Sequence, residues 1–255
     1  MTKVISLFNQ AGGVGKSTLT MNLGYHLAQK QHRVLLVDMD PQGSLTLFMG
    51  LEPSELKQTV YEMLIDDEGD GDTAPPLHQL HKMTLLPANI NLSGAELELV
   101  TADARDYRLK DALRDLQPQY DFVLVDCPPS LGILSYISLV ASTHVLVPIQ
   151  TQYKAFCGTE LLFKTVARIR KRTNPDLKFA GFLPTMYASQ NSQDRRALGA
   201  IAEQMSSIGK VFEPIGRSTA FADAVEDHLP LAVFNPKHPA LAVLDNIAEY
   251  LEKVT

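Results

Sequence analysis

Short hydrophobic runs alternate along the chain with longer segments in which apolar residues recur every three or four positions. Several runs are apolar on both alternating faces, which is typical of strands buried in a parallel sheet. The three-to-four spacing predicts helices over residues 17–31, 156–172 and 193–209. We expect strands at residues 3–9, 33–40, 83–89, 121–129, 144–150, 179–187 and 210–216. This alternation predicts a single α/β domain over residues 1–255, with a doubly wound, mostly parallel sheet covered by helices on both faces.

Composition and charge then limit the function. A length of 255 residues suits one large domain, and 45% hydrophobic residues supply a full core. With 23 basic and 29 acidic residues the formal net charge is −6, so nucleic acid can bind only at a local basic surface. No run approaches the roughly 18 to 20 apolar residues that span a bilayer, and no signal peptide opens the chain. We therefore expect a soluble, cytoplasmic protein, with a surface loop at the acidic stretch 66–76.

A glycine-rich segment follows the first predicted strand and opens the first predicted helix. Glycines let backbone N–H groups approach phosphate oxygens, and the helix N-terminus adds a positive dipole end. A lysine at this place reaches the β and γ phosphates, and a serine hydroxyl binds Mg²⁺. The general P-loop pattern has glycine six residues before the lysine, where this chain has Gln10, so the loop is a variant. The predicted nucleotide-binding residues are Gly12, Gly13, Val14, Gly15, Lys16, Ser17 and Thr18.

Three carboxylates stand where predicted strands end. Asp38 and Asp40 close the run "LLVDMD", and Asp126 closes the run "DFVLVD". Ligands of doubly wound sheets bind outside the carboxyl ends of the strands. A carboxylate there can hold Mg²⁺ through water or orient an attacking water. Asp38 and Asp40 could equally be turn-forming residues before a proline, whereas all three segments together, in this order, indicate a phosphate-processing site.

With these motifs the sequence resembles the ParA/MinD family of deviant Walker ATPases, and within it the ParA branch. The resemblance rests on "AGGVGKS", "DMDPQGSLT" and "DFVLVDCPPSLG", and it continues through "VLVPIQTQY", "FLPTMY" and "IGRSTAFADAV". It covers nearly the whole chain and is weak only from about residue 52 to 118. The resemblance implies an enzyme that uses ATP and Mg²⁺, forms an ATP-dependent homodimer and binds non-specific DNA. It also implies that a small adaptor carried on a cargo stimulates hydrolysis.

Individual roles follow from the same resemblance. By family position, Lys16 and Ser17 bind phosphate and Mg²⁺, and Asp38 supports the metal region. Asp40 positions the water, and Asp126 is the Walker B carboxylate near Mg²⁺. The adenine pocket of the family falls near Thr185, Met186 and Pro214, and Gly216 stands where relatives often have proline.

The sequence departs from the family at Ala11, where the signature lysine reaches across the dimer to the partner's phosphates. A methyl group cannot do this, so two alternatives follow. Either the site binds nucleotide and hydrolyses it poorly, or another lysine supplies the charge in trans. Lys154, just after the predicted strand 144–150, is the candidate, and its other interpretation is a solvated surface lysine. Loss of the signature lysine also resembles the carboxysome-positioning branch of ParA-like ATPases.

Basic residues late in the chain are candidates for DNA contact. Arg195 and Arg196 follow the predicted strand 179–187, and Arg217 follows the run 210–216, in the part of the chain where ParA relatives carry DNA-binding arginines. The alternative is ordinary solvated charge, which we favour for the basic helix end 168–172. DNA binding implies a nucleoid-associated protein. The acidic C-terminal segment "LDNIAEYLEKVT" lacks the basic amphipathic character of a membrane anchor, so we expect no membrane binding.

The sequence features also bear on three alternative functions: a partition ATPase, a biosynthetic ligase and a redox ATPase. A partition ATPase for a plasmid or chromosome differs from a carboxysome-positioning ATPase only in its cargo, which the sequence does not name. A biosynthetic P-loop ligase needs a charged pocket for a second substrate, for which the sequence has no motif. A redox ATPase of the nitrogenase iron-protein type needs cluster-ligating cysteines, and the settings of Cys127 and Cys157 do not suit that role.

Overall fold

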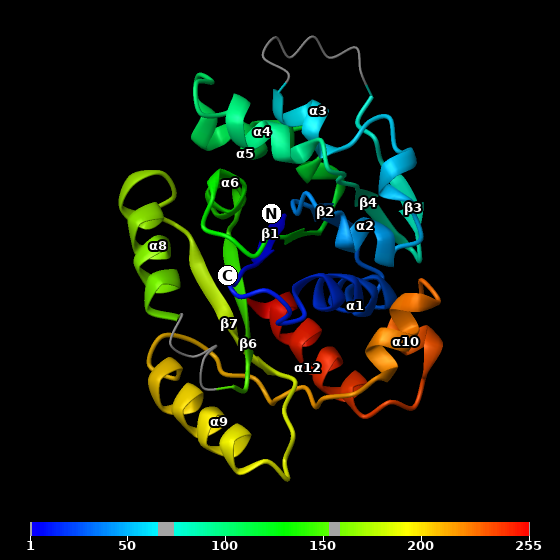
Figure 1. The fold of residues 1–255 in the computed structure, drawn as a ribbon, viewed down its shortest axis with the longest axis vertical. Coiled ribbons are helices and arrows are strands. Elements are labelled where there is room, and N and C mark those ends of the chain that lie inside the picture. The colour runs from blue at the N-terminus through cyan, green and yellow to red at the C-terminus, as the bar shows by residue number, and fades with distance from the viewer. Residues whose placement is uncertain (1, 66–73, 153–158, 255) are drawn as a thin grey trace.

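The computed structural model describes residues 2–65, 74–152 and 159–254. Lys154, Cys157 and residues 66–73 of the acidic stretch lie outside the described residues. A seven-stranded sheet forms the centre, in the order β3-β4-β2-β5-β1-β6-β7 (Figure 1). Only β3 is antiparallel to its neighbour among these strands. The strands are β1 Lys3–Leu7, β2 Val34–Asp38, β3 His78–Leu80, β4 Met83–Leu86, β5 Phe122–Asp126, β6 His144–Gln150 and β7 Lys178–Thr185.

Helices cover both faces of the sheet (Figure 1). The α-helices are α1 Lys16–Gln29, α2 Ser44–Phe48, α3 Val60–Ile65, α4 Leu92–Glu98, α5 Arg108–Ala112, α6 Ile133–Ala141, α8 Thr159–Arg172, α9 Ser192–Met205, α10 Ala220–Glu226, α11 Leu231–Phe234 and α12 Ala240–Lys253. Short 3₁₀ turns within the described residues lie at Pro53–Glu55, Arg105–Tyr107 and Gln117–Gln119. The doubly wound α/β architecture that the sequence predicted is confirmed.

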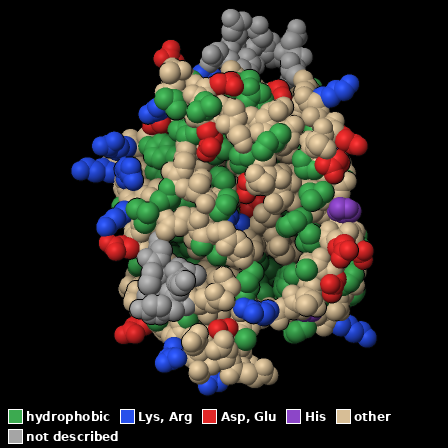
Figure 2. Space-filling view, in the orientation of Figure 1, with side chains coloured by type: hydrophobic (Ala, Val, Ile, Leu, Met, Phe, Trp, Pro, Cys, Tyr) green, Lys and Arg blue, Asp and Glu red, His purple; other side chains and the backbone are tan. Residues whose placement is uncertain are grey.

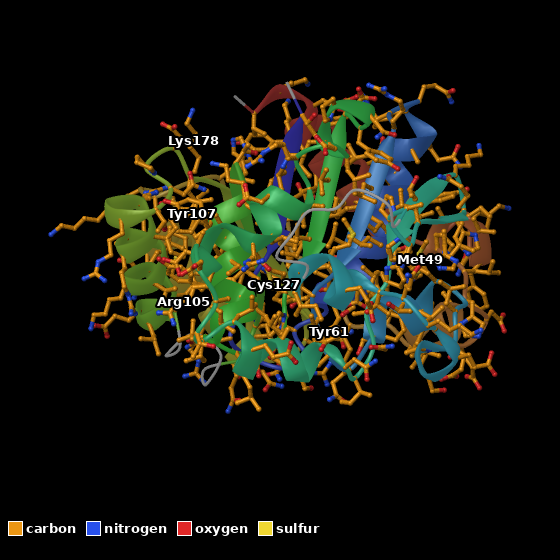
Figure 3. All side chains as sticks on the ribbon, turned by 90° about the horizontal axis from the view of Figure 1, so that it is seen from above. Met49, Tyr61, Arg105, Tyr107, Cys127 and Lys178 are labelled. Carbon is orange, nitrogen blue, oxygen red and sulfur yellow. The ribbon has the colours of Figure 1, made fainter. Side chains whose placement is uncertain are left out.

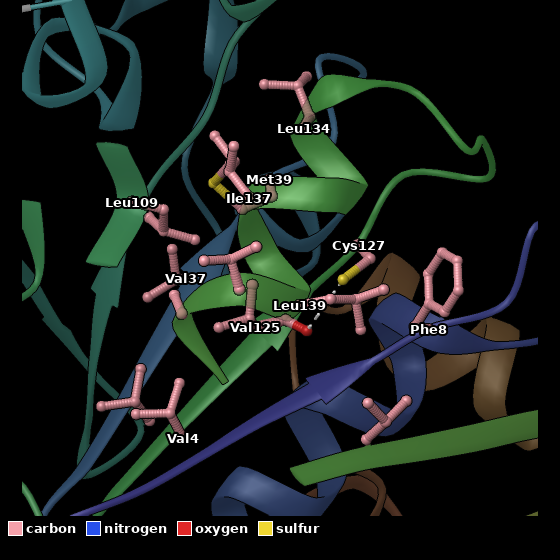
Figure 4. Packing of buried hydrophobic residues seen from close by; sticks show 14 of the residues in the cluster. Val4, Phe8, Val37, Met39, Leu109, Val125, Cys127, Leu134, Ile137 and Leu139 are labelled. Carbon is pink, nitrogen blue, oxygen red and sulfur yellow. Dashed lines mark hydrogen bonds between the residues drawn. The ribbon is translucent and has the colours of Figure 1, made fainter. Parts of the chain in front are cut away.

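Successive residues of the central strands pack into two separate hydrophobic cores, one on each face of the sheet. Val37 packs in the cluster that contains residues of α6, whereas its neighbour Leu36 packs in the cluster that contains residues of α1 and α12. Figure 4 shows the first cluster, where Ile137 and Leu139 of α6 lie over the strands. Because both faces of the central strands are buried, consecutive positions in their sequences are apolar rather than only every second one, as in "VLLV" of β2.

Helix α12 ends the described chain and packs against α1. Its apolar side is buried, with Leu244 and Leu251 fully covered. On its polar side the Lys30 ammonium lies 3.1 Å from a carboxylate oxygen of Asp245 and 3.4 Å from one of Glu249. Within the described ranges, no helix combines the length and apolar character needed to cross a membrane.

One strand prediction is wrong. Residues 210–216 form two isolated bridges beside β7, Phe182 with Val211 and Tyr187 with Gly216, instead of a strand. Pro214 has no N–H to donate to the neighbouring backbone, so a continuous ladder cannot form there. The structure also adds β3, which the sequence analysis did not predict because this three-residue edge strand is short and partly polar.

Candidate nucleotide-binding site

Strands β1, β2 and β5 end at the same edge of the sheet. In the strand register Leu7 pairs with Asp126, and Asp126 pairs with Asp38. The fold therefore brings the glycine-rich loop, the two-aspartate segment and the β5 carboxylate together. Figure 2 shows a hollow near the middle of one face in which both acidic and basic side chains are visible.

The loop geometry leaves the start of α1 open. Gly13 and Gly15 have φ angles of +70° and +90°, which glycine adopts readily and other residues rarely do. Gly15 is the N-cap residue of α1, and no side chain caps the helix by hydrogen bonding. The first turn of α1 also contains no acidic residue. The first N–H groups and the positive end of the helix dipole are thus presented to an anion.

Lys16 folds back over its own loop. Its Nζ donates to the carbonyls of Asn9 and Ala11, both at 3.1 Å, and the residue is only 7% exposed. Burial lowers the pKa of Lys16, and the negative charge of Asp126 opposes that shift. The Asn9 side chain holds the loop by donating to the Pro148 carbonyl at 2.6 Å and accepting from the Ala11 N–H at 3.0 Å. The cation therefore sits at the centre of the loop.

Asp38 is fully buried, and hydrogen bonds reach both of its oxygens. Oδ1 accepts from the Asp40 N–H at 3.1 Å, and Oδ2 accepts from the N–H and hydroxyl of Thr46 at 2.9 and 2.8 Å. Burial is the main cause that raises the pKa of Asp38 to about 6. The Thr46 hydroxyl also accepts from the Ala88 N–H at 2.9 Å. Asp38 thus anchors the turn that carries the half-buried Asp40, whose Oδ1 accepts from the Gln42 N–H at 3.0 Å.

Asp126 has a different environment. It is fully buried, and neither carboxylate oxygen has a hydrogen-bond partner among the described residues. Burial, followed by the charge of Asp38, raises the pKa of Asp126 well above its usual value, and the nearby Ser17 hydroxyl opposes the shift. A buried carboxylate whose oxygens lack hydrogen-bond partners, next to a serine hydroxyl, fits a hard cation, which prefers oxygen ligands.

A metal ion held here would need further ligands. The described residues contain no group of three His, Cys, Asp or Glu side chains arranged to hold a metal ion. Mg²⁺ typically takes one or two carboxylates and completes its coordination with waters and substrate phosphates. The donor set therefore fits a magnesium ion that arrives with a nucleotide.

Cys127 follows Asp126 directly and plays no visible part in the site. Burial raises the pKa of its thiol to about 12, so it stays protonated. Its Sγ lies 3.9 Å from the Val125 carbonyl (Figure 4). Figure 3 shows Cys127 near the middle of the molecule, with Arg105 and Tyr107 to one side and Met49 to the other. This buried thiol suits packing rather than cluster ligation.

The residues of the predicted adenine pocket lie beside the loop. The Thr185 hydroxyl donates to the Val14 carbonyl at 3.1 Å. The Ile215 N–H donates to the Pro184 carbonyl at 2.9 Å, which places Pro214 next to the end of β7. Met186 has a left-handed φ of +54°. The structure thus brings Thr185, Met186 and Pro214 to one region beside the glycine-rich loop.

The candidate DNA-contacting arginines are all exposed. Arg195 and Arg196 lie in the first two turns of α9, and Arg195 Nη1 donates to the Ser189 carbonyl at 2.9 Å. Arg217 lies near this loop because its N–H donates to the Tyr187 carbonyl at 3.0 Å. The basic end of α8 is a separate surface, where Lys and Arg side chains gather on one side of the molecule (Figure 2). Arg170 there is held by the Leu177 carbonyl.

Sequence reasoning missed two residues that shape this site, Asn9 and Thr46. Both act through hydrogen bonds to residues distant in sequence, Asn9 to Pro148 and Thr46 to Ala88. The only sequence signal was their position next to motif residues, which does not specify a partner.

Comparison with known proteins agrees with this geometry. A family model described as "AAA domain" matches residues 2–179. "Sporulation initiation inhibitor protein Soj" of Bacillus subtilis is 36% identical over 250 residues, which is 98% of each chain. "Chromosome partitioning protein ParA" of Myxococcus xanthus is 43% identical over 188 residues, which is 74% of this chain and 66% of that protein.

Two solved structures extend the comparison. "Cobyrinic Acid a,c-diamide synthase" of Mycobacterium smegmatis with bound ATP analog and magnesium has a TM-score of 0.86 and 36% identity, over 99% of this chain and 95% of that one. The ATP complex of an McdA variant from Cyanothece has a TM-score of 0.84 and 23% identity, over 100% and 98%. The second likeness shows a shared fold alone.

The doubly wound sheet and the glycine-rich loop at the start of α1 define a P-loop nucleotide-binding protein. With 36% identity to Soj over nearly the full length of both proteins, the chain belongs to the ParA/Soj family of partition ATPases.

Proposed function

We propose that this protein is an ATP·Mg-dependent ATPase that dimerises, binds non-specific DNA and positions a cargo on the nucleoid, with hydrolysis stimulated by a small adaptor on the cargo. The observation that carries the proposal is the unpaired carboxylate of Asp126 beside Ser17, at the open start of α1. A buried carboxylate without hydrogen-bond partners is costly, and Mg²⁺ that arrives with ATP supplies an interaction for its oxygens.

Different residues of the site bind phosphate, hold the metal and orient the attacking water. The N–H groups of residues 13–18 bind phosphate oxygens, and Lys16 exchanges its two carbonyl bonds for the β and γ phosphates. Ser17 and Asp126 hold the metal side of the nucleotide, and bound Mg²⁺ neutralises charge on the phosphates. Asp40 orients the attacking water, and Asp38 holds the Asp40 turn in place through its bonds to the Asp40 and Thr46 N–H groups.

Retention on non-specific DNA tests the proposal as a whole. We expect the protein to stay on immobilised DNA of arbitrary sequence only with ATP and Mg²⁺, and to be released steeply as salt rises. Equal retention with and without nucleotide would contradict the coupling of the two activities.

Lys154→Ala is expected to abolish ATP-dependent dimerisation or hydrolysis. We propose that this lysine replaces the trans-acting charge that Ala11 lacks, since a phosphate clamp requires a charge at the right place and not at a fixed sequence position. Sedimentation with ATP and steady-state phosphate release measure the two effects. The matched test is Ala11→Lys in the Lys154→Ala background, which should restore activity. Unchanged turnover in Lys154→Ala would show that Lys154 is a solvated surface residue.

Arg195→Ala, Arg196→Ala and Arg217→Ala are each expected to weaken DNA retention about equally for all sequences. Each arginine that contacts one phosphate should lower the slope of log K against log salt by about one when removed. Titration of labelled DNA at several salt concentrations measures the slope, with ATP turnover in the absence of DNA as the check on folding.

The basic end of α8 offers the matched control. Replacing Arg168, Lys171 and Arg172 together removes three charges from exposed positions on another surface. We expect a smaller loss of DNA retention than from the simultaneous replacement of Arg195, Arg196 and Arg217 by alanine. An equal loss would mean that overall charge, and not the α9 region, determines binding.

We propose the carboxysome as the cargo, since Ala11 replaces the lysine whose loss resembles the carboxysome-positioning branch. The alternative is partition of a plasmid or chromosome, which the names of the Soj and ParA relatives support. A fluorescent fusion that spaces carboxysomes in a deletion strain supports the first, and rescue of a plasmid-loss phenotype supports the second.

A biosynthetic ligase is the second candidate function, because the Mycobacterium smegmatis structure that shares 36% identity carries the name of an amide-forming synthase. A ligase would hydrolyse ATP only with its small-molecule acid and an amide donor present. Turnover that responds to DNA and not to such an acid favours the positioning ATPase.

A further inference from the structure

A line of hydrogen bonds joins the glycine-rich loop to the start of α9 through buried residues. The Val14 carbonyl accepts from the Thr185 hydroxyl at 3.1 Å. The Thr185 carbonyl accepts in turn from the Thr151 N–H at 3.1 Å. The Thr151 hydroxyl lies 3.3 Å from the same carbonyl and 3.4 Å from Asp194 Oδ2. The line thus connects the loop after β1, the ends of β6 and β7, and α9.

Asp194 is the least expected member of this line. It is only 3% exposed, although it lies in the first turn of a surface helix. Its Oδ2 also accepts from the Ala188 N–H at 2.9 Å. The helix does not need this carboxylate to begin, because the Asn191 side chain already caps it by accepting from the Gln193 N–H at 2.9 Å. A single buried oxygen therefore ties α9 to the loop after β7 and to the end of β6.

The segment between Thr185 and α9 is held in a strained form. Met186 has a left-handed φ of +54°, which costs free energy for a residue with a side chain. Such strain persists only where the surroundings determine the conformation, and it is often found where a structure switches. The Tyr187 N–H bonds to the Ile215 carbonyl on one side, and Arg195 bonds to the Ser189 carbonyl on the other.

We propose that Asp194 is a positioning residue that makes the placement of α9 follow nucleotide binding at the glycine-rich loop. The Thr151 hydroxyl has one proton and two acceptors within reach, the Thr185 carbonyl and Asp194. A nucleotide that moves the backbone at Val14 moves Thr185, and this shifts the proton between the two acceptors. The inference rests on the proposed function, in which the loop takes ATP and α9 carries Arg195 and Arg196.

Amide hydrogen exchange of the full-length protein, with and without ATP and Mg²⁺, tests this proposal without DNA. In the wild type, nucleotide should slow exchange at residues 12–20 and change it at residues 186–196. Asp194→Ala should keep the first effect and reduce the second about fivefold, the change in equilibrium that one buried hydrogen bond produces. Asp194→Asn has an amide oxygen that can accept the same two bonds, and it should keep both effects.

Two further variants make the test specific. Thr151→Val keeps the shape and loses only the hydroxyl, so it should reproduce the alanine result even if Asp194→Ala fails to fold. Glu203→Gln changes an exposed carboxylate of the same helix and should behave as the wild type.

Three outcomes would overturn the proposal: no change at residues 186–196 in the wild type, an unaltered change there in both Asp194→Ala and Thr151→Val, or equal loss of protection at residues 12–20. Equal loss of protection at residues 12–20 would mean that Asp194 stabilises the nucleotide-binding loop itself. If instead Arg195→Ala and Arg196→Ala bind DNA normally while the exchange results hold, the DNA surface of the proposed function is wrong and the positioning role stands.

Discussion

Lys16→Ala is expected to remove nucleotide binding and turnover almost completely. The lysine is buried at the centre of the loop, where its Nζ donates to the Asn9 and Ala11 carbonyls. Loss of a preorganised charge at a transferring phosphoryl group typically lowers the rate by about 10²- to 10³-fold or more. Titration with a fluorescent ATP analogue and phosphate release measure the loss of affinity and of rate.

The matched control is Lys171→Ala, which removes an exposed lysine from α8 and should leave both quantities unchanged. Circular dichroism and thermal unfolding check that Lys16→Ala still folds, because the substitution removes the donor from the buried Asn9 carbonyl. Turnover in Lys16→Ala within about threefold of the wild type would mean that the phosphates bind elsewhere.

Asp126→Asn should stabilise the nucleotide-free protein while it abolishes the effect of Mg²⁺ on nucleotide binding. The wild-type carboxylate is buried without a partner, and a neutral amide of the same shape avoids most of that desolvation cost. A gain of 1 kcal/mol corresponds to about 2 to 4 °C in a protein of this size. Thermal unfolding without nucleotide, and ATP titrations with and without EDTA, measure the two effects.

The stabilisation should depend on pH with a definite sign. The pKa of Asp126 is higher in the folded protein than in the unfolded chain, because burial disfavours the charged form. Its contribution to stability is therefore full below about pH 4 and is lost as pH rises through the folded value. The gain from Asp126→Asn should be largest near pH 8 and small near pH 4. A variant less stable than the wild type at pH 8 would contradict the assignment of a buried, unpaired charge.

The sequence predicts the central strands well because burial on both faces makes consecutive positions apolar, as in the first four residues of "FVLVD" in β5. It fails at the edges of the sheet. Strand β3 is too short and polar to stand out, and residues 210–216 are apolar enough to suggest a strand although Pro214 interrupts the pairing. Edge segments meet the sheet on one side only, so their pattern carries less information about pairing.

The candidate site likewise contains residues that the sequence predicts and contacts that it does not. Lys16 was predictable because it follows the glycine-rich loop at the start of α1, and Asp126 was predictable because it ends an apolar strand. Contacts between distant segments were not, and the bonds of Thr46 to Ala88 and of Asp194 to Thr151 are examples. Such pairs depend on how the sheet is ordered, which single-chain periodicity does not specify.

The uncapped start of α1 has a consequence for the life of the protein in a cell. A helix cap is worth about 1 kcal/mol, and a nucleotide seated on these N–H groups takes the place of the missing one. Ligand at roughly a thousandfold excess over its Kd adds about 4 kcal/mol to the free energy of unfolding. Cells short of ATP and ADP therefore hold a larger unfolded fraction, which proteases remove. The abundance of this protein should then follow the total concentration of ATP and ADP in the cell even when its synthesis is constant.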